Sequence, residues 1–326
     1  MNLNRRRIFQ LAGATLVAVQ RPPSTWAQSY PVRPVRVIVP VAAGGANDTA
    51  TRLVMQKLSA SLGQQFIVEN QGGGGGNIGM GAAAKAMADG YTILSTASSF
   101  VINPNLYAKL PYDAGRDFAP VTLMCLTTHV VVVHPSVPAK DIQELVALLK
   151  VNPGKYSYAS AGTGTPAHLA GELFKVSFGL DLVHVPFQGG GPGMTSTIGG
   201  HTPIAFSALT TAAPNVKAGH VRGLAVMSAK RSSLLPDIPT MAEAGASDQE
   251  ADVIVGILVP LGTPKEFITV LHREIAKVMA QPEVRQRMAT LGLEPVVNTP
   301  DEFADWIKVE TAKWAKVVRA ANLQIQ

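Results

Sequence analysis

The feature that most constrains the fold is a recurring unit: a β-rich run, a glycine-rich turn and an amphipathic helix. β-rich runs include VRVIVPV from Val35, FIVEN at 66–70 and HVVVVH at 129–134. Alternating strands and helices predict mostly parallel sheets covered by helices. Because 326 residues exceed the usual size of one domain, we expect two such α/β domains.

Capping residues predict where the helices begin. A helix is expected at 47–63 with Asn47 or Asp48 as its cap, and Thr165 with Pro166 begins another. Capping boxes at 263–266 and 299–302 predict the last two helices. The apolar spacing predicts which side chains face inward: Ile142, Leu145, Val146 and Leu149; Phe267, Leu271 and Ile275; and Phe303, Trp306, Ile307 and Trp314.

Four glycine-rich turns follow a strand and open a helix: Ala42–Asp48, Gly72–Gly76, Ser160–Thr165 and Gln188–Gly193. The first turn of a helix leaves N–H groups unpaired, and the helix dipole places partial positive charge there. Glycines let the backbone approach a bound anion closely. Four such turns can therefore converge on one anionic ligand without a metal or a lysine.

The glycine run also contains G-x-G-x-x-G, at Gly74, Gly76 and Gly79, which raises the alternative of a dinucleotide site. That site needs an acidic residue about 20 positions further on to hold the ribose. Residues 93–105 contain no acid, and the chain has no phosphate-binding P-loop motif. We therefore expect no cofactor, and glycines with positive φ that shape a strand-to-helix turn.

Catalytic and metal-binding patterns are incomplete. Ser160 lacks the first glycine of G-x-S-x-G, and the seven histidines show no metal-ligand spacing. Cys125 lies in the apolar run VTLMCL, which predicts a buried, inert thiol. His168 either touches a ligand or is structural, and Asp48 is explained as a cap or as a partner of Arg52. We expect no metal and no enzymatic activity.

The N-terminus has the pattern of a secretory signal peptide cleaved near Ala27. Its arginines fit either a twin-arginine or an ordinary signal. Residues 1–27 hold four of the 28 basic residues and none of the 22 acidic ones, so 24 basic residues remain against 22 acidic. We therefore expect an exported, periplasmic protein without a nucleic-acid partner.

Six stretches carry a resemblance that spans nearly the whole chain after the signal. They are YPVRPVRVIVPVAAGGANDTATRL, VENQGGGGGNIGMGAAAKAMADGYTIL, YASAGTGTPAHLAGELF, HVPFQGGGPGMTSTIGGHTPIAF, VKAGHVRGLAVMS and LVPLGTP. In these stretches the chain resembles the Bug-type periplasmic solute-binding proteins of tripartite tricarboxylate transporters.

The resemblance implies a type II-like binding-protein fold in which two α/β domains, each a mixed, mostly parallel sheet flanked by helices, close on a ligand in the cleft between them. The domains would be 28–128 with 251–326, and 129–250. The ligand would be a small organic carboxylate passed to a membrane permease, and we expect a monomer. The alternative is a ligand-dependent sensor that presents its closed form to a membrane histidine kinase.

The resemblance also implies the site. The expected ligand-binding residues are Ala43, Gly44, Gly45, Asn47 and Asp48; Thr96, Ser98 and Ser99; Ser160, Gly162, Thr163, Gly164, Thr165 and His168; and Phe187, Pro192, Phe206 and Ser207. Family members often carry Tyr at Phe187, Asp at Ser207 and Trp at Val255. The first and last departures, which remove a hydroxyl and an indole, predict a more apolar and roomier pocket, and this favours an aromatic or aliphatic acid over an amino acid.

Overall fold

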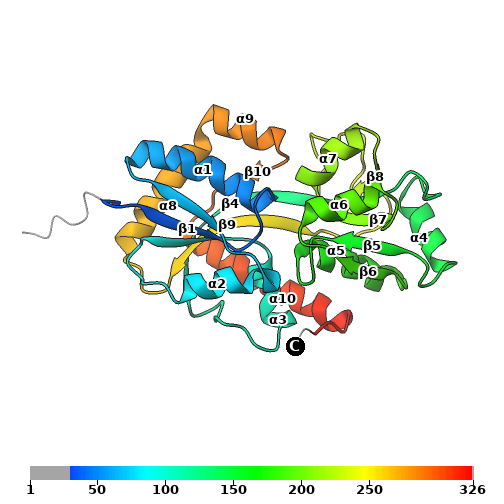
Figure 1. The fold of residues 1–326 in the computed structure, drawn as a ribbon, viewed down its shortest axis with the longest axis horizontal. Coiled ribbons are helices and arrows are strands. Elements are labelled where there is room, and N and C mark those ends of the chain that lie inside the picture. Colours follow the sequence, from blue (N-terminus) through cyan, green and yellow to red (C-terminus); the bar gives the residue numbers. More distant parts are fainter. Residues whose placement is uncertain (1–29, 325–326) are drawn as a thin grey trace, which may run out of the picture. The chain divides into compact units, whose positions relative to one another are not determined.

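The computed structural model describes residues 30–324, so the predicted signal peptide lies outside the described residues. In that part of the chain one mixed sheet has the strand order β2-β1-β3-β9-β4-β7-β5-β6, and β8 and β10 each pair with β4 (Figure 1). The strands are β1 (Val35–Val39), β2 (Phe66–Asn70), β3 (Thr92–Thr96), β4 (Phe118–Val133), β5 (Ser157–Ser160), β6 (Val183–Pro186), β7 (Ile204–Ala208), β8 (Arg222–Val226), β9 (Asp252–Pro260) and β10 (Glu294–Pro295).

Two groups of three parallel strands follow the predicted alternation. Strands β2, β1 and β3 form the first, which we call the β1 group. Strands β6, β5 and β7 form the second, the β5 group. Each strand is followed by a helix, so the strand-to-helix turns lie at the carboxyl edge of each group. These helices are α1 (Ala46–Leu62), α2 (Asn77–Ala84), α3 (Ser99–Leu106), α5 (Pro166–Phe178), α6 (Gly190–Ile198) and α7 (Leu209–Lys217).

Two long antiparallel strands connect the groups, and the sequence reading did not anticipate them fully. The run HVVVVH is only the last part of β4, whose earlier residues Phe118–Thr128 pair with β9. From His129 onward β4 pairs with β7 and β8. Strand β9 is almost entirely buried and therefore reads as one apolar run without alternation.

The remaining helices are α4 (Ile142–Lys150), α8 (Lys265–Ala280), α9 (Pro282–Thr290) and α10 (Pro300–Ala320). The capping box of α10 is confirmed: the Glu302 N–H donates to Thr299 Oγ1 at 3.3 Å, and the Thr299 N–H donates to Glu302 Oε2 at 2.8 Å. The box predicted for α8 is wrong. The hydroxyl of Thr263 donates instead to the Pro260 carbonyl at 2.7 Å, because it is buried at the end of β9.

Most predicted inward residues lie in the core. Leu271, Ile275, Phe303 and Trp314 are buried, as are Ile142, Leu145 and Leu149, whereas Phe267 is only half-buried. Val146, Trp306 and Ile307 are partly buried and pack against the core. Helix α10 contacts α3, α5 and β4. None of the helices described within residues 30–324 is long and apolar enough to cross a bilayer.

Candidate ligand-binding site

The β1–α1 turn presents unpaired backbone donors. Helix α1 begins after Gly45, which has no side chain to cap it. The Thr49 N–H is the first to bond back, to the Gly45 carbonyl at 2.9 Å. The N–H groups of Ala46, Asn47 and Asp48 have no hydrogen-bond acceptor among the described residues. Ala43 is exposed at the same turn. The dipole and these donors make the turn suited to an anion.

Asp48 is directed into the protein, which explains how an acidic residue can lie beside unpaired backbone donors. Its carboxylate accepts from the Gly44 N–H at 2.9 Å, Arg52 Nε at 2.9 Å and Asn70 Nδ2 at 2.8 Å. The predicted pair with Arg52 is therefore confirmed. The prediction that Asn47 or Asp48 caps α1 is wrong, because both lie within the first helical turn and neither side chain bonds the first amides.

Asn47 joins this turn to the end of β3. Its Nδ2 donates to the Thr96 carbonyl at 2.7 Å. Next along the chain, Ser98 Oγ donates to the Asp252 carbonyl at 3.2 Å and accepts the Ile254 N–H at 3.0 Å. Ser98 therefore fixes β9 to the start of α3, and its hydroxyl is already used. Ser99 differs, since its buried Oγ has no hydrogen-bond partner among the described residues.

The glycine run beside Ser99 has the predicted backbone. Gly73 to Gly76 all have positive φ, between 55° and 117°. A Cβ on Gly76 would lie 2.9 Å from Met80 Cε, 3.1 Å from the Pro40 carbonyl oxygen and 3.3 Å from Ser99 Oγ. This glycine therefore lets α2 start against the end of β1, beside the unpartnered hydroxyl of Ser99.

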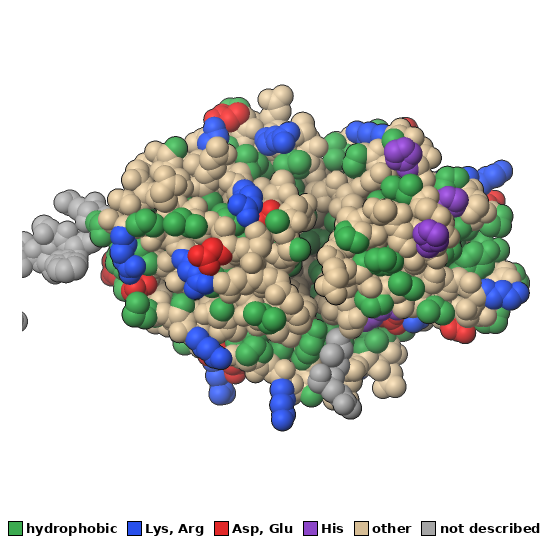
Figure 2. Space-filling model, viewed as in Figure 1, with side chains coloured by type: hydrophobic (Ala, Val, Ile, Leu, Met, Phe, Trp, Pro, Cys, Tyr) green, Lys and Arg blue, Asp and Glu red, His purple; other side chains and the backbone are tan. Residues whose placement is uncertain are grey.

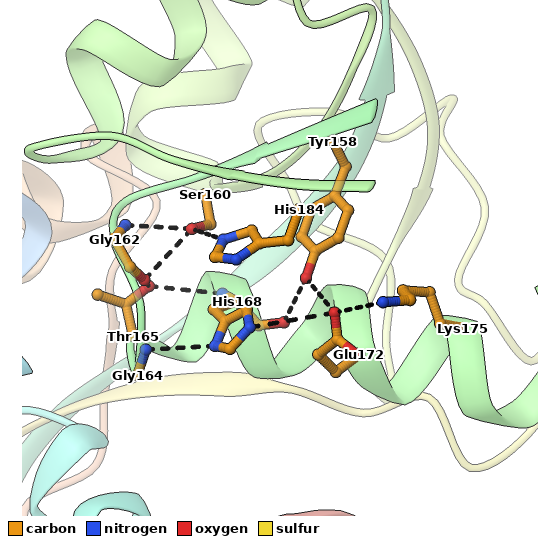
Figure 3. Close-up of polar contacts among 9 residues, drawn as sticks. All are labelled: Tyr158, Ser160, Gly162, Gly164, Thr165, His168, Glu172, Lys175 and His184. Atoms are coloured by element: carbon orange, nitrogen blue, oxygen red, sulfur yellow. Dashed lines mark hydrogen bonds and ion pairs between the residues drawn. The ribbon is translucent and has the colours of Figure 1, made fainter. Parts of the chain in front are cut away.

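The β5–α5 turn is the counterpart in the other group. Thr165 is the N-cap of α5 and Pro166 follows it, as predicted. The Gly162 N–H donates to Ser160 Oγ at 3.1 Å, and the Gly164 N–H donates to His168 Nδ1 at 3.2 Å (Figure 3). No described residue accepts from the N–H groups of Ala161, Thr163 or Ala167. These three donors are therefore unpaired within the described residues.

His168 lies beneath this turn, and its exposed fraction is 5%. Its ring stacks on His184 with centroids 4.0 Å apart, and its Nε2 lies 4.0 Å from Glu172 Oε1. Burial, and secondly the charge of Lys175, lowers the pKa of His168 to about 4. The neutral ring thus accepts a turn amide at Nδ1, which favours the structural role over direct ligand contact.

Glu172 is the centre of the polar cluster beneath the turn. It accepts from Tyr158 Oη at 2.7 Å and from Lys175 Nζ at 2.9 Å (Figure 3). The Lys175 charge is therefore already paired with a carboxylate. The polar groups of the turn itself are backbone amides and the hydroxyls of Ser160, Thr163 and Thr165. The cation of this cluster, Lys175, points to Glu172 and not to the turn.

The β6–α6 turn and the end of β7 supply the last four expected residues. Phe187 is half-buried and Pro192 is exposed, so both can border a site. Phe206 and Ser207 lie on opposite faces of β7. Phe206 is buried in the core against Tyr158 and Phe174. Ser207 Oγ is buried without a partner among the described residues.

Tyr107 is a residue that the sequence reading missed. Its hydroxyl lies 2.8 Å from the position of a Cβ on Gly75 and 3.3 Å from that on Gly164. It therefore lies against the glycine run of the β1 group and the β5–α5 turn at once. A tyrosine after an irregular helix containing Pro104 carries no pattern that would single it out.

Charge and metal ligands are sparse around these turns. On the face shown in Figure 2, charged side chains lie at the edges and in two groups within the left half, and uncharged ones border the hollow near the middle of the view. Within residues 30–324 no group of three His, Cys, Asp or Glu could hold a metal. Cys125 is buried, as predicted, and burial raises the pKa of its thiol to about 12.

The fold, with two strand-to-helix turns that present unpaired amides, is that of a solute-binding protein. Residues 50–323 match the model of the tripartite tricarboxylate transporter family receptor, and the chain belongs to that family. It is 32% identical to protein BugT of Bordetella pertussis over 99% of this chain and all of that protein. The predicted resemblance to Bug-type proteins is thereby confirmed.

Two solved structures have the same fold over all of their own length and 91% of this chain. One, described as a periplasmic transporter, is 41% identical with a TM-score of 0.86. The other, R. palustris Rpa4515 with adipate, is 30% identical with a TM-score of 0.87. A third solved structure, that of periplasmic binding protein BugD, is 33% identical with a TM-score of 0.85. The predictions of a two-domain binding-protein fold and of a non-enzyme are thereby confirmed.

Proposed function

We propose that the protein captures a small organic carboxylate between the β1–α1 turn and the β5–α5 turn and delivers it to a tripartite tricarboxylate-type permease. The observation that carries the proposal is the set of unpaired amides at the start of α1 and α5. They face a site whose nearby charges, Asp48 with Arg52 and Glu172 with Lys175, are already paired. Backbone donors then supply the attraction for an anion.

The ligand class follows from the apolar borders of the site. Half-buried Phe187 offers no hydroxyl to a ligand, and Val255, which is fully buried, adds only aliphatic packing behind the site. An aliphatic or aromatic acid with one or two carboxylates fits such borders better than an amino acid does. That the solved relative Rpa4515 is described with adipate supports an aliphatic dicarboxylate as the first probe.

We further propose that residues 28–128 with 251–326, and residues 129–250, are the domains that close on the ligand. Support comes from β4, which changes partner from β9 to β7 between Thr128 and His129. Thr128 pairs with Asp252 at the start of β9. The two places where the chain would pass from one proposed domain to the other therefore lie side by side. Export by the signal at 1–27, periplasmic location and a monomeric state complete the proposal.

The test is calorimetric titration of the full chain with adipate and with benzoate, followed by the Ser160→Ala variant. A hydrogen bond to a charged group contributes roughly 1.5–3 kcal/mol, so affinity should fall about tenfold or more. Ser136→Ala, a surface serine that pairs with His134, is the matched control and should bind as the wild type does. Unchanged affinity in Ser160→Ala would move the site away from the β5–α5 turn.

A further inference from the structure

The hydroxyl of Ser160 is surrounded by three polar atoms (Figure 3). It accepts the Gly162 N–H at 3.1 Å, lies 3.2 Å from the Gly162 carbonyl oxygen, and lies 2.7 Å from His184 Nε2. A hydroxyl has one proton to donate. The direction of the short bond to His184 therefore decides whether that proton is used inside the protein or is available to a ligand.

The hydrogen bonds of the Gly162 carbonyl indicate which of Ser160 and His184 donates to the other. It already accepts from Thr165 Oγ1 at 2.6 Å and from the Thr165 N–H at 3.2 Å, which occupies both of its lone pairs. If Ser160 donated to His184, its oxygen would face the carbonyl oxygen at 3.2 Å with no proton between them. If His184 donates, Ser160 donates to the carbonyl at 3.2 Å, and this long bond to an oxygen with two other donors holds the serine proton only weakly.

The surroundings of His184 hold its ring in place and neutral. The ring stacks on His168 with centroids 4.0 Å apart and on Tyr158 with centroids 4.9 Å apart. Burial and the neighbouring His168 lower the pKa of His184 to about 3, although Glu172 opposes the shift. A neutral imidazole carries one N–H, so its tautomer is a definite property that can be measured.

We propose that His184 is a positioning residue whose Nε2–H donates to Ser160 Oγ and so leaves the serine proton for the carboxylate of the bound ligand. The inference rests on the proposed function, in which Ser160 donates to that carboxylate. His184 lies behind Ser160 and acts only through it. The stacked histidines thereby convert a serine, which can both donate and accept, into a committed donor for an anion.

The first test needs no ligand. Nitrogen-15 NMR of the full chain, with the His184→Gln spectrum to assign the ring, identifies which nitrogen carries the proton. We expect the proton on Nε2 near neutral pH. A proton on Nδ1, with Nε2 as the acceptor, overturns the proposal whatever the affinities are.

The second test is a double-mutant cycle with adipate as the probe. His184→Leu removes the donor and should lower affinity about tenfold, as Ser160→Ala does, whereas His184→Gln keeps an N–H in place and should retain most of it. In the Ser160→Ala background, His184→Leu should cause no further loss. An equal loss in both backgrounds means that His184 is merely structural and contradicts the proposal.

A control variant and the tautomer measurement separate a failure of the His184 proposal from a failure of the proposed ligand site. His134→Leu breaks a similar histidine–serine contact on the surface, where His134 Nδ1 lies 2.6 Å from Ser136 Oγ, and should leave adipate binding unchanged. If Ser160→Ala itself binds adipate normally, the proposed grip has failed, whatever His184 does. If His184→Leu does not fold, as circular dichroism would show, the tautomer measurement on the wild type decides alone.

Discussion

The phenol oxygen of Tyr107 lies 2.8 Å from the point where a Cβ on Gly75 would begin. Gly75 also has a φ of +66°, which a residue with a Cβ adopts only at a cost. Asn103 completes the contact, since its Nδ2 donates to the Gly75 carbonyl at 3.0 Å. The glycine at this position therefore serves both the turn and the tyrosine packed against it.

The first prediction concerns this contact. Gly75→Ala should destabilise the fold by roughly 1–2 kcal/mol from the left-handed backbone alone, and further because the methyl group displaces Tyr107. Gly74→Ala is the matched control: its φ is +55°, but a Cβ there would meet nothing closer than 3.8 Å. Urea unfolding of the two variants measures the difference.

Tyr107→Phe tests the same contact from the side of the tyrosine. Removing the hydroxyl should relieve part of the cost of Gly75→Ala, so the double variant should be more stable than the sum of the single changes predicts. Strict additivity, or equal costs for Gly74→Ala and Gly75→Ala, would mean that Tyr107 does not constrain the glycine run.

Asp48 provides the second prediction. Asp48→Ala removes the acceptor of the Gly44 N–H, of Arg52 and of Asn70, and should destabilise the fold by about 1–3 kcal/mol because these donors lose their partner. Asp305→Ala is the control, since its pair with Lys308 is exposed and should be worth less than about 1 kcal/mol. Equal melting temperatures for the two variants would refute the internal role of Asp48.

The third prediction concerns how the stability of the fold changes at acidic pH. Burial lowers the pKa of His129 to about 4 from 6.5, against a smaller opposing effect of its hydrogen bond to Ala251. Between these values the unfolded chain binds a proton that the folded chain does not. Stability should therefore be unaffected by His129 above about pH 6.5 and fall as pH is lowered toward 4, by about 1.4 kcal/mol per pH unit.

His168 should contribute in the same direction, because its pKa is also lowered to about 4. Asp252 acts oppositely: burial raises its pKa to about 6 from 3.8, so the folded chain binds the extra proton in that window. Urea unfolding at pH 7.5, 6.0 and 5.0 gives the slope of the free energy of unfolding against pH. His129→Gln should reduce it by the equivalent of one proton, and an unchanged slope would contradict the assignment.

Much of the fold could be predicted because the strands and helices carry local signals. The Thr299 box and the Thr165–Pro166 start are local, and both formed as expected. The Thr263 box has the same pattern but failed, since its hydroxyl is used by a carbonyl at the end of β9. A local sequence pattern cannot show that another group in the folded protein will take the hydroxyl as its hydrogen-bond partner.

The candidate site divides in the same way. Glycine-rich turns identified the donors at α1 and α5, because unpaired amides follow from any helix start. The contact of Tyr107 with Gly75 and Gly164 joins residues distant in sequence, and nothing near Tyr107 in the chain announces it. Phe206 was expected at the ligand but lies in the core, because residues 206 and 207 face opposite sides of their strand.

The fourth prediction returns to the glycine run. Gly76→Val would place a branched side chain against Met80, Pro40 and Ser99, and should weaken carboxylate binding or domain closure. The wild type should show no affinity for NAD, FAD or ATP by fluorescence or calorimetry. Micromolar binding of any of them would revive the dinucleotide interpretation of Gly74, Gly76 and Gly79.

The most direct test of the central claim is native mass spectrometry and calorimetry of the full chain with mono-, di- and tricarboxylates and aromatic acids. We predict one bound acid per chain, and an increase in the free energy of unfolding of about 2.7 kcal/mol at 100 times the dissociation constant. The acid should be recovered unchanged by chromatography. Failure of every carboxylate to bind, or turnover of one that does, would contradict the account.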